Sequence, residues 1–127
     1  MAKDSINKVR ILLVDDNESN RKVAMLMLDR LGYEYDAVSN GPEAIQAVGH
    51  SHYDIVLMDI VMPGMDGLEV SRKMRKIGLN GLKIIGITAY VVPDIREICL
   101  EAGMDDCITK PMRIKDLELA LISVRGN

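Results

Sequence analysis

The chain has 127 residues, a formal net charge of -3 and 48% hydrophobic residues, which suits one domain around one core; we expect a single domain over 1–127 with its core at about 9–124. Basic residues are scattered singly and in pairs, which argues against direct nucleic-acid binding. No apolar run approaches the roughly 20 residues of a membrane span and the start is polar, so we expect a cytoplasmic protein without membrane insertion.

Short apolar runs alternate with segments of helical periodicity along the whole chain. The runs predict buried strands at 10–14, 55–58 and 82–87 and a short last strand at 107–108. Residues 33–38 alternate apolar and polar, which suits a strand at the edge of the sheet. Helices are predicted from Ser19 to a stop at Gly32, in a short segment after Pro42, from Asp66 to near Gly78, from Asp94 to Ala102 after Pro93, and from Ile114 to Val124. The apolar stripe of the first helix is expected to contain Val23, Ala24, Met27, Leu28 and Leu31, and that of the third Leu68, Val70, Met74 and Ile77.

Five alternations of strand and helix without an internal repeat are typical of a parallel sheet covered by helices on both faces. We therefore predict an α/β protein, a three-layer α/β/α sandwich. The simplest topology is flavodoxin-like, a five-stranded parallel sheet in the order 2-1-3-4-5, which places the first and third strands side by side.

Polar side chains follow four of the predicted strands. Asp15 and Asp16 end the first strand, Asp59 ends the third, and Thr88 and Lys110 follow the last two. Each signal alone is weak, because a lone Asp after a strand is more often a cap or turn residue. Parallel strands, however, end at the same edge of the sheet, so these five side chains are expected to converge.

Three neighbouring carboxylates would repel one another unless a cation lay among them. Hard oxygen ligands without His or Cys suit Mg²⁺, with Mn²⁺ as the alternative ion. Lys110 offers a positive charge and Thr88 a hydroxyl donor for phosphoryl oxygens. A carboxylate nucleophile, a divalent metal, a Lys and a Thr together predict a site that forms an aspartyl phosphate.

Four segments, LLVDDN, LMDIVMPGMDG, GITA and ITKP, resemble the signatures of the response-regulator receiver domain of two-component and phosphorelay systems. The resemblance implies that Asp59 accepts a phosphoryl group from a sensor histidine kinase or histidine phosphotransfer protein. It implies a metal site formed by Asp16, Asp59 and the backbone carbonyl of Val61, with Asp15 acting through water. It also implies that Thr88 and Lys110 bind the phosphoryl group, and that the Lys110-Pro111 bond is cis.

Two positions depart from the family pattern. Receivers commonly carry Tyr or Phe three residues before the lysine, as an aromatic switch, where this chain has Cys107. Tyr90 is either a substitute ring or a plain surface residue. Val61 is apolar where many receivers have a polar side chain that helps to place the hydrolytic water. We therefore expect a long-lived acyl phosphate, shielded by Val61 and Tyr90.

The two cysteines, Cys99 and Cys107, are too few and wrongly spaced for a metal cage or a disulfide framework. We interpret them as small hydrophobic residues of the core in a reducing compartment.

The predicted function is a phosphorylation-activated signalling module that catalyses only its own phosphorylation and dephosphorylation, and so is not an enzyme in the turnover sense. A downstream protein is expected on the fourth helix, the last strand and the last helix. The first alternative is a receiver-like scaffold that binds partners without phosphorylation. The second alternative is a small phosphatase or phosphotransferase that uses Asp59 on a free substrate; such enzymes usually need a second acid and a cap over the site, and no insertion here is long enough to make one. Flavin binding is disfavoured because the acidic first loop would repel a phosphate.

Overall fold

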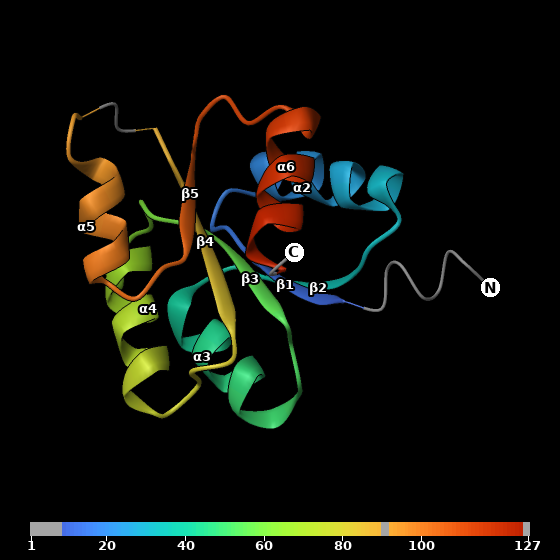
Figure 1. Ribbon diagram of the computed structural model, residues 1–127. Coiled ribbons are helices and arrows are strands. Elements are labelled where there is room, and N and C mark those ends of the chain that lie inside the picture. The colour runs from blue at the N-terminus through green and yellow to red at the C-terminus, as the bar shows by residue number, and fades with distance from the viewer. Residues whose placement is uncertain (1–8, 90–91, 126–127) are drawn as a thin grey trace.

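The computed structural model describes residues 9–89 and 92–125. Within these ranges five parallel strands form one sheet in the order β2-β1-β3-β4-β5, which confirms the predicted topology (Figure 1). The strands are β1 (Arg10–Val14), β2 (Glu34–Val38), β3 (Ile55–Asp59), β4 (Lys83–Thr88) and β5 (Asp106–Thr109). Their bounds lie within two residues of the predicted ones.

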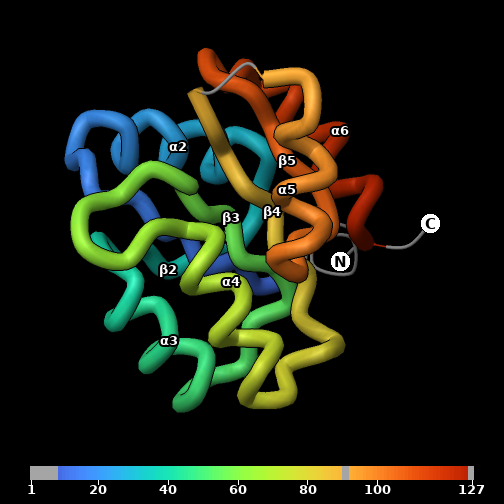
Figure 2. The backbone as a smooth tube through the Cα atoms, turned by 90° about the vertical axis from the view of Figure 1, so that its left-hand side faces the viewer, coloured from blue at the N-terminus to red at the C-terminus, as the bar shows by residue number. Residues whose placement is uncertain are grey.

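Among the described residues, five helices cover the two faces of the sheet, giving the three layers that were expected. They are α2 (Glu18–Leu31), α3 (Gly41–His50), α4 (Gly67–Lys76), α5 (Ile95–Glu101) and α6 (Ile114–Val124). Helices α2 and α6 lie on one face, and α3, α4 and α5 lie on the other (Figures 1 and 2). None of the described helices is long and apolar enough to cross a membrane.

The core has two halves because successive side chains of a strand point to opposite faces of the sheet. Leu12 and Val14 of β1 pack with the α3, α4 and α5 side. Ile11 and Leu13 pack with the α2 and α6 side. Burial on both faces explains why β1, β3 and β4 have continuous apolar sequences rather than alternating ones.

Three helices start at a polar capping residue. The side chains of Asn17, Asn40 and Asp66 each accept a hydrogen bond from the backbone N–H three residues further on. These bonds satisfy backbone donors that have no partner inside the helix. Because Asn17 is the cap, α2 begins at Glu18 rather than at the predicted Ser19.

Two residues assigned to buried helical stripes are exposed. Val23 is 51% exposed and Ile77 is 57% exposed, so the prediction that they are buried is wrong. Ile77 caps the end of α4, where the helix has already passed the core it covers. Val23 lies beside the loop between β5 and α6 and lines a cavity there rather than the core.

Candidate functional site

Three carboxylates meet where β1 and β3 end. Asp15 and Asp16 follow β1, Asp59 is the last residue of β3, and one ligand oxygen of each lies within 4.8 Å of the others. The two strands are hydrogen-bonded neighbours, which is why residues far apart in sequence converge. Asp59 is only 3% exposed and Asp15 only 4%, whereas Asp16 is exposed to solvent.

Lys110 joins this cluster from the far side of β4. Its Nζ lies 3.3 Å from Oδ2 of Asp59. Its backbone N–H donates to the carbonyl oxygen of Thr88 at 2.7 Å, which ties the loop after β5 to the end of β4. Thr88 itself is fully buried at that end. The Lys110-Pro111 bond is cis, as the resemblance implied. All five predicted side chains therefore belong to one edge of the sheet.

The ionised form of Asp15 is destabilised in this position. Burial raises the pKa of Asp15 above its usual 3.8, and the charges of Asp59 and Asp16 raise it further. The backbone N–H of Asn17, 2.9 Å from Asp15 Oδ1, and the Lys110 ammonium act in the opposite direction. A divalent cation among the carboxylates would offset the repulsion that remains.

The donor set fits a hard divalent cation. Three carboxylates offer oxygen ligands within reach of one ion, and no His or Cys belongs to the described cluster. Mg²⁺ prefers such ligands and keeps several of its waters. The backbone of Val61 lies next to the site, because its N–H donates a hydrogen bond to Oδ1 of Asp59, with 3.3 Å between the nitrogen and the oxygen. That its carbonyl is a further ligand remains a prediction.

The loop after Asp59 is held against the start of α4 by a glycine. The N–H of Gly67 donates to the carbonyl oxygen of Ile60 at 2.8 Å. A Cβ on Gly67 would lie 2.5 Å from the carbonyl oxygen of Asp59 and 2.8 Å from the Cα of Ile60. Both are backbone atoms that cannot swing aside, so the absence of a side chain at Gly67 permits the close approach that positions Asp59.

An apolar cavity opens directly beside the carboxylates, with a volume of about 480 Å³. Asp15 and Lys110 lie in its wall, and the remaining lining residues come from α2, β4 and the loop after β5: Asn20, Val23, Ala24, Ile87, Pro111 and Met112. Sequence reasoning missed this cavity. No pattern in the sequence marked it, because Val23 has the spacing of a buried helical residue and yet lines the cavity.

The structure places two of the residues at which the chain departs from the family pattern, Cys107 and Val61. Cys107 is half-buried in β5, three residues before Lys110. The side chain of Val61, two residues after Asp59, is 48% exposed. Tyr90, considered as a substitute for the missing aromatic switch, lies outside the described residues.

Comparisons with known proteins agree with this geometry. The family model described as "Response regulator receiver domain" matches residues 11–122. The sensor histidine kinase RcsC of Escherichia coli K12 is 38% identical over 87% of the chain, but the chain spans only 12% of that protein.

Solved receiver structures are similar over nearly their whole length. The receiver domain of a sensor histidine kinase from Pseudomonas aeruginosa PAO1, with a magnesium ion coordinated in its active site cleft, has a TM-score of 0.84 and 36% identity, covering 94% of this chain and 98% of that one. The response regulator TrrA from Thermotoga maritima, in complex with Mg²⁺ and BeF, has a TM-score of 0.81 and 34% identity, covering 91% and 98%. The chain belongs to the response-regulator receiver domain family of two-component and phosphorelay signalling, and it is related to the receiver domains of hybrid sensor histidine kinases.

Proposed function

We propose that Asp59 is the phospho-acceptor of this receiver domain. The observation that carries the proposal is the position of its carboxylate, buried between two other carboxylates and the Lys110 ammonium. A carboxylate oxygen of Asp59 attacks the phosphorus of a phosphohistidine on a sensor kinase or phosphotransfer protein. The P–N bond breaks, the imidazole leaves with the electron pair and takes up a proton, and an acyl phosphate remains on Asp59.

Asp15, Asp16 and Asp59 would hold Mg²⁺, or Mn²⁺ in its place, together with the Val61 carbonyl. When bound, the ion supplies positive charge that neutralises the carboxylates and the transferred phosphoryl oxygens. Lys110 and the Thr88 hydroxyl bind those oxygens from the other side. Because Lys110 is already paired with Asp59 at 3.3 Å, it needs only a small movement to reach a phosphoryl group attached there.

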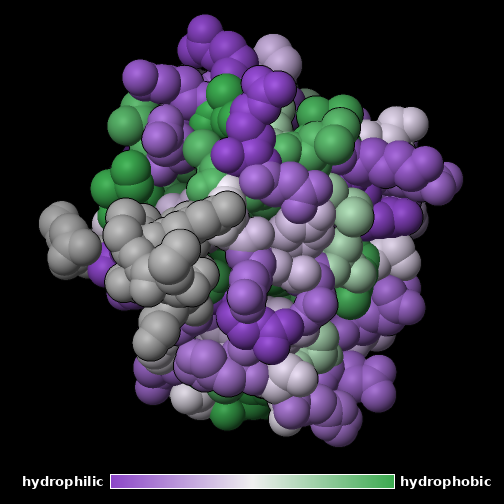
Figure 3. Space-filling view, turned by 90° about the vertical axis from the view of Figure 1, so that its right-hand side faces the viewer, coloured by the Kyte–Doolittle hydropathy of each residue, from purple (hydrophilic) through white to green (hydrophobic). Residues whose placement is uncertain are grey.

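The phosphohistidine donor is proposed to dock on α2 and the loop between β5 and α6. A donor histidine must reach Asp59, and the apolar cavity beside the site has Asp15 and Lys110 in its wall. Val23 and Leu26 of α2 extend this surface with exposed apolar side chains. Figure 3, viewed from that side of the molecule, shows hydrophobic side chains gathered in its upper half between hydrophilic ones.

Phosphorylation adds about two negative charges at the edge of the sheet. Movement of Thr88 and Lys110 toward the phosphoryl group would bias the segment after Thr88, with α5, between two packings. We propose that a downstream protein binds α5, β5 and α6.

The domain catalyses only its own phosphorylation and dephosphorylation. A cytoplasmic location stays a prediction.

The test is the intact mass of the protein after incubation with acetyl phosphate and Mg²⁺, and separately with a phosphorylated histidine phosphotransfer protein. The proposal predicts one phosphoryl adduct that is lost with EDTA, labile to hydroxylamine and absent from Asp59→Asn. Absence of an adduct with both donors would favour the alternative, a receiver-like scaffold that binds partners without phosphorylation.

A further inference from the structure

Two thiols that are separate in the sequence meet between α5 and β5. Cys99 lies on the inner face of α5 and is 1% exposed, and Cys107 is half-buried in β5. Cys107 packs against the buried cluster that contains Cys99, and the two thiols are close enough for Cys107 to contribute to the raised pKa of Cys99. Figures 1 and 2 agree that α5 runs alongside β5, so the pair joins a helix to the strand beside it.

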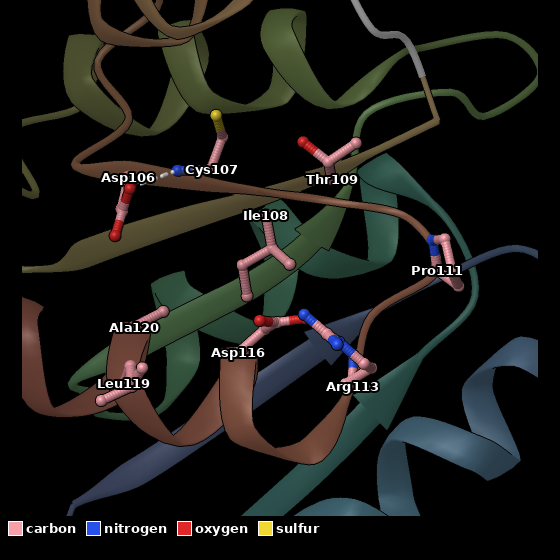
Figure 4. Close-up of a pocket in the computed structure, with 9 residues that line it drawn as sticks. All are labelled: Asp106, Cys107, Ile108, Thr109, Pro111, Arg113, Asp116, Leu119 and Ala120. Carbon is pink, nitrogen blue, oxygen red and sulfur yellow. Dashed lines mark hydrogen bonds and ion pairs between the residues drawn. The ribbon is translucent and has the colours of Figure 1, made fainter.

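The Cys107 thiol is held on the α5 side of the strand. Figure 4 shows its sulfur on the side of β5 opposite to Ile108, which points toward α6. The carboxylate of Asp106 accepts a hydrogen bond from the Cys107 N–H at 2.8 Å and pairs with Arg96 of α5, also at 2.8 Å. The Arg96–Asp106 ion pair therefore links α5 to β5 next to Cys107.

The two thiols differ in their surroundings. Burial raises the pKa of Cys99 to about 12, and the neighbouring Cys107 contributes to the rise. Cys99 is therefore a neutral thiol at physiological pH and a poor first nucleophile. Cys107 is half-buried, whereas Cys99 is 1% exposed. An oxidant from solvent meets Cys107 first.

We propose that Cys99 and Cys107 form a reversible disulfide when the protein meets hydrogen peroxide, and that this bond fastens α5 to β5. The Cys107 thiolate attacks one peroxide oxygen, the O–O bond breaks, and a sulfenic acid forms while hydroxide leaves and is protonated to water. The Cys99 sulfur then attacks the sulfenic sulfur. Its proton leaves with the displaced hydroxyl as a second water. The two thiols lose two electrons in total, and the peroxide gains them.

The disulfide would act on the output side of the domain rather than on the phospho-acceptor. This consequence rests on the proposed function, in which α5 and β5 repack after phosphorylation. A covalent bond between them restricts that repacking, while Asp59 and its carboxylate neighbours keep their positions. Transient disulfides of this kind are the usual form in reducing compartments, where stable structural ones are rare. The proposal adds a redox role to the two cysteines, which were expected only to be small hydrophobic residues of the core.

The first experiment measures the bond itself. The intact chain is exposed to dilute hydrogen peroxide, denatured, treated with iodoacetamide and digested. Alkylation reports thiols alone, which matters because the nine methionines also take up oxygen. We expect a Cys99–Cys107 cross-linked peptide within a monomer, and recovery of both alkylated cysteines after dithiothreitol. Two free thiols, a disulfide between chains, or oxidation of Cys107 beyond the sulfenic acid would overturn the proposal.

Cys99→Ser and Cys107→Ser give the matched comparison. Cys99→Ser is expected to accumulate a Cys107 sulfenic acid, trapped by dimedone, several-fold above the wild-type level, because the second thiol is missing. Cys107→Ser is expected to keep Cys99 reduced. Equal dimedone labelling of Cys107 in wild type and Cys99→Ser would contradict the pairing, and circular dichroism confirms that both variants are folded.

The second experiment separates the disulfide from the phosphorylation. Oxidised and reduced protein are treated with acetyl phosphate and Mg²⁺, and amide hydrogen exchange of α5 and β5 is compared. We expect equal phosphoryl adducts in both, with a phosphorylation-dependent change in exchange only in the reduced form. The same change in both forms would overturn the locking role. No adduct in either form would count against the proposed function and leave the disulfide measurement standing.

Discussion

The Nζ of Lys110 lies 3.3 Å from Oδ2 of Asp59, although β4 separates their strands in the sheet. The pairing places a positive charge inside a cluster of three carboxylates. Lys110 reaches it from a loop that is tied to the end of β4 through its own N–H. The same ammonium therefore competes with a metal ion for Asp59 and is available to a phosphoryl group once one is attached.

Lys110→Ala tests this double role. Without the ammonium, Mg²⁺ has no competitor for Asp59 and should bind more tightly. Phosphorylation by acetyl phosphate should nevertheless slow by about 100-fold or more, the usual cost of removing a donor to a developing oxyanion. Calorimetric titration with Mg²⁺ and intact mass against time measure the two effects. Weaker Mg²⁺ binding, or an unchanged rate, would contradict the assignment.

Asp15→Asn removes a carboxyl group whose ionisation destabilises the folded state. Because the folded pKa of Asp15 is raised above 3.8, the folded protein keeps this proton to higher pH than the unfolded chain. The contribution of Asp15 to the free energy of unfolding of the metal-free protein therefore falls as pH rises from 3.8 through the folded pKa. In EDTA the variant should be more stable than wild type at pH 7, and this advantage should vanish at about pH 3, where both states are protonated.

Bound Mg²⁺ should reverse the stability difference between Asp15→Asn and wild type. The variant should bind Mg²⁺ about 10–100-fold more weakly, the range found when a residue that orients a metal site is changed. Added Mg²⁺ should then raise the melting temperature of wild type by more than that of Asp15→Asn. Thermal unfolding against pH, with and without Mg²⁺, provides all of these comparisons, and equal stability of the two proteins in EDTA at pH 7 would count against the charge argument.

Gly67→Ala should disturb the phospho-acceptor loop. The new Cβ would lie 2.5 Å from the carbonyl oxygen of Asp59, so backbone must move, and we expect a loss of about 1–3 kcal/mol in the free energy of unfolding. Gly49→Ala is the control, because a Cβ at this position of α3 meets nothing within 4 Å. It should stabilise the helix by about 0.5–1 kcal/mol. Urea unfolding of both variants decides the matter, and a neutral Gly67→Ala would refute the close-packing argument.

Leu26→Asp tests the docking surface without touching the reacting groups. Leu26 is 67% exposed on α2, so the free energy of unfolding should change by no more than about 0.5 kcal/mol. Transfer from a phosphorylated histidine phosphotransfer protein should slow by about tenfold, while the reaction with acetyl phosphate is unchanged. Leu100→Asp, at a 49% exposed position of α5, should affect neither donor. Equal losses with both donors would contradict a docking role.

The fold was predictable because the sequence of each central strand shows that the strand is buried. Continuous apolar residues in β1 and β3 indicate strands buried on both faces, and parallel strands bring Asp15 and Asp59 to one edge. Hydrophobic periodicity does not show which part of the molecule lies next to each residue of a helical stripe. Val23 fits a buried stripe by spacing, but it is 51% exposed and lines the cavity beside the carboxylates.

The same limit explains the thiol pair. Cys99 and Cys107 belong to different elements, and their contact depends on how α5 sits against β5. The distance between them in the sequence carries no information on that packing. The carboxylates were easier to place, because their positions depend on strand ends alone.

The most direct measurement identifies the residue that carries the phosphoryl group. The protein is phosphorylated with acetyl phosphate and Mg²⁺, reduced with borohydride, which converts an aspartyl phosphate to homoserine, and mapped by tandem mass spectrometry. We predict homoserine at position 59, with Asp15 and Asp16 unchanged. Homoserine at position 15 or 16, or none in protein that carries the adduct, would contradict the central claim.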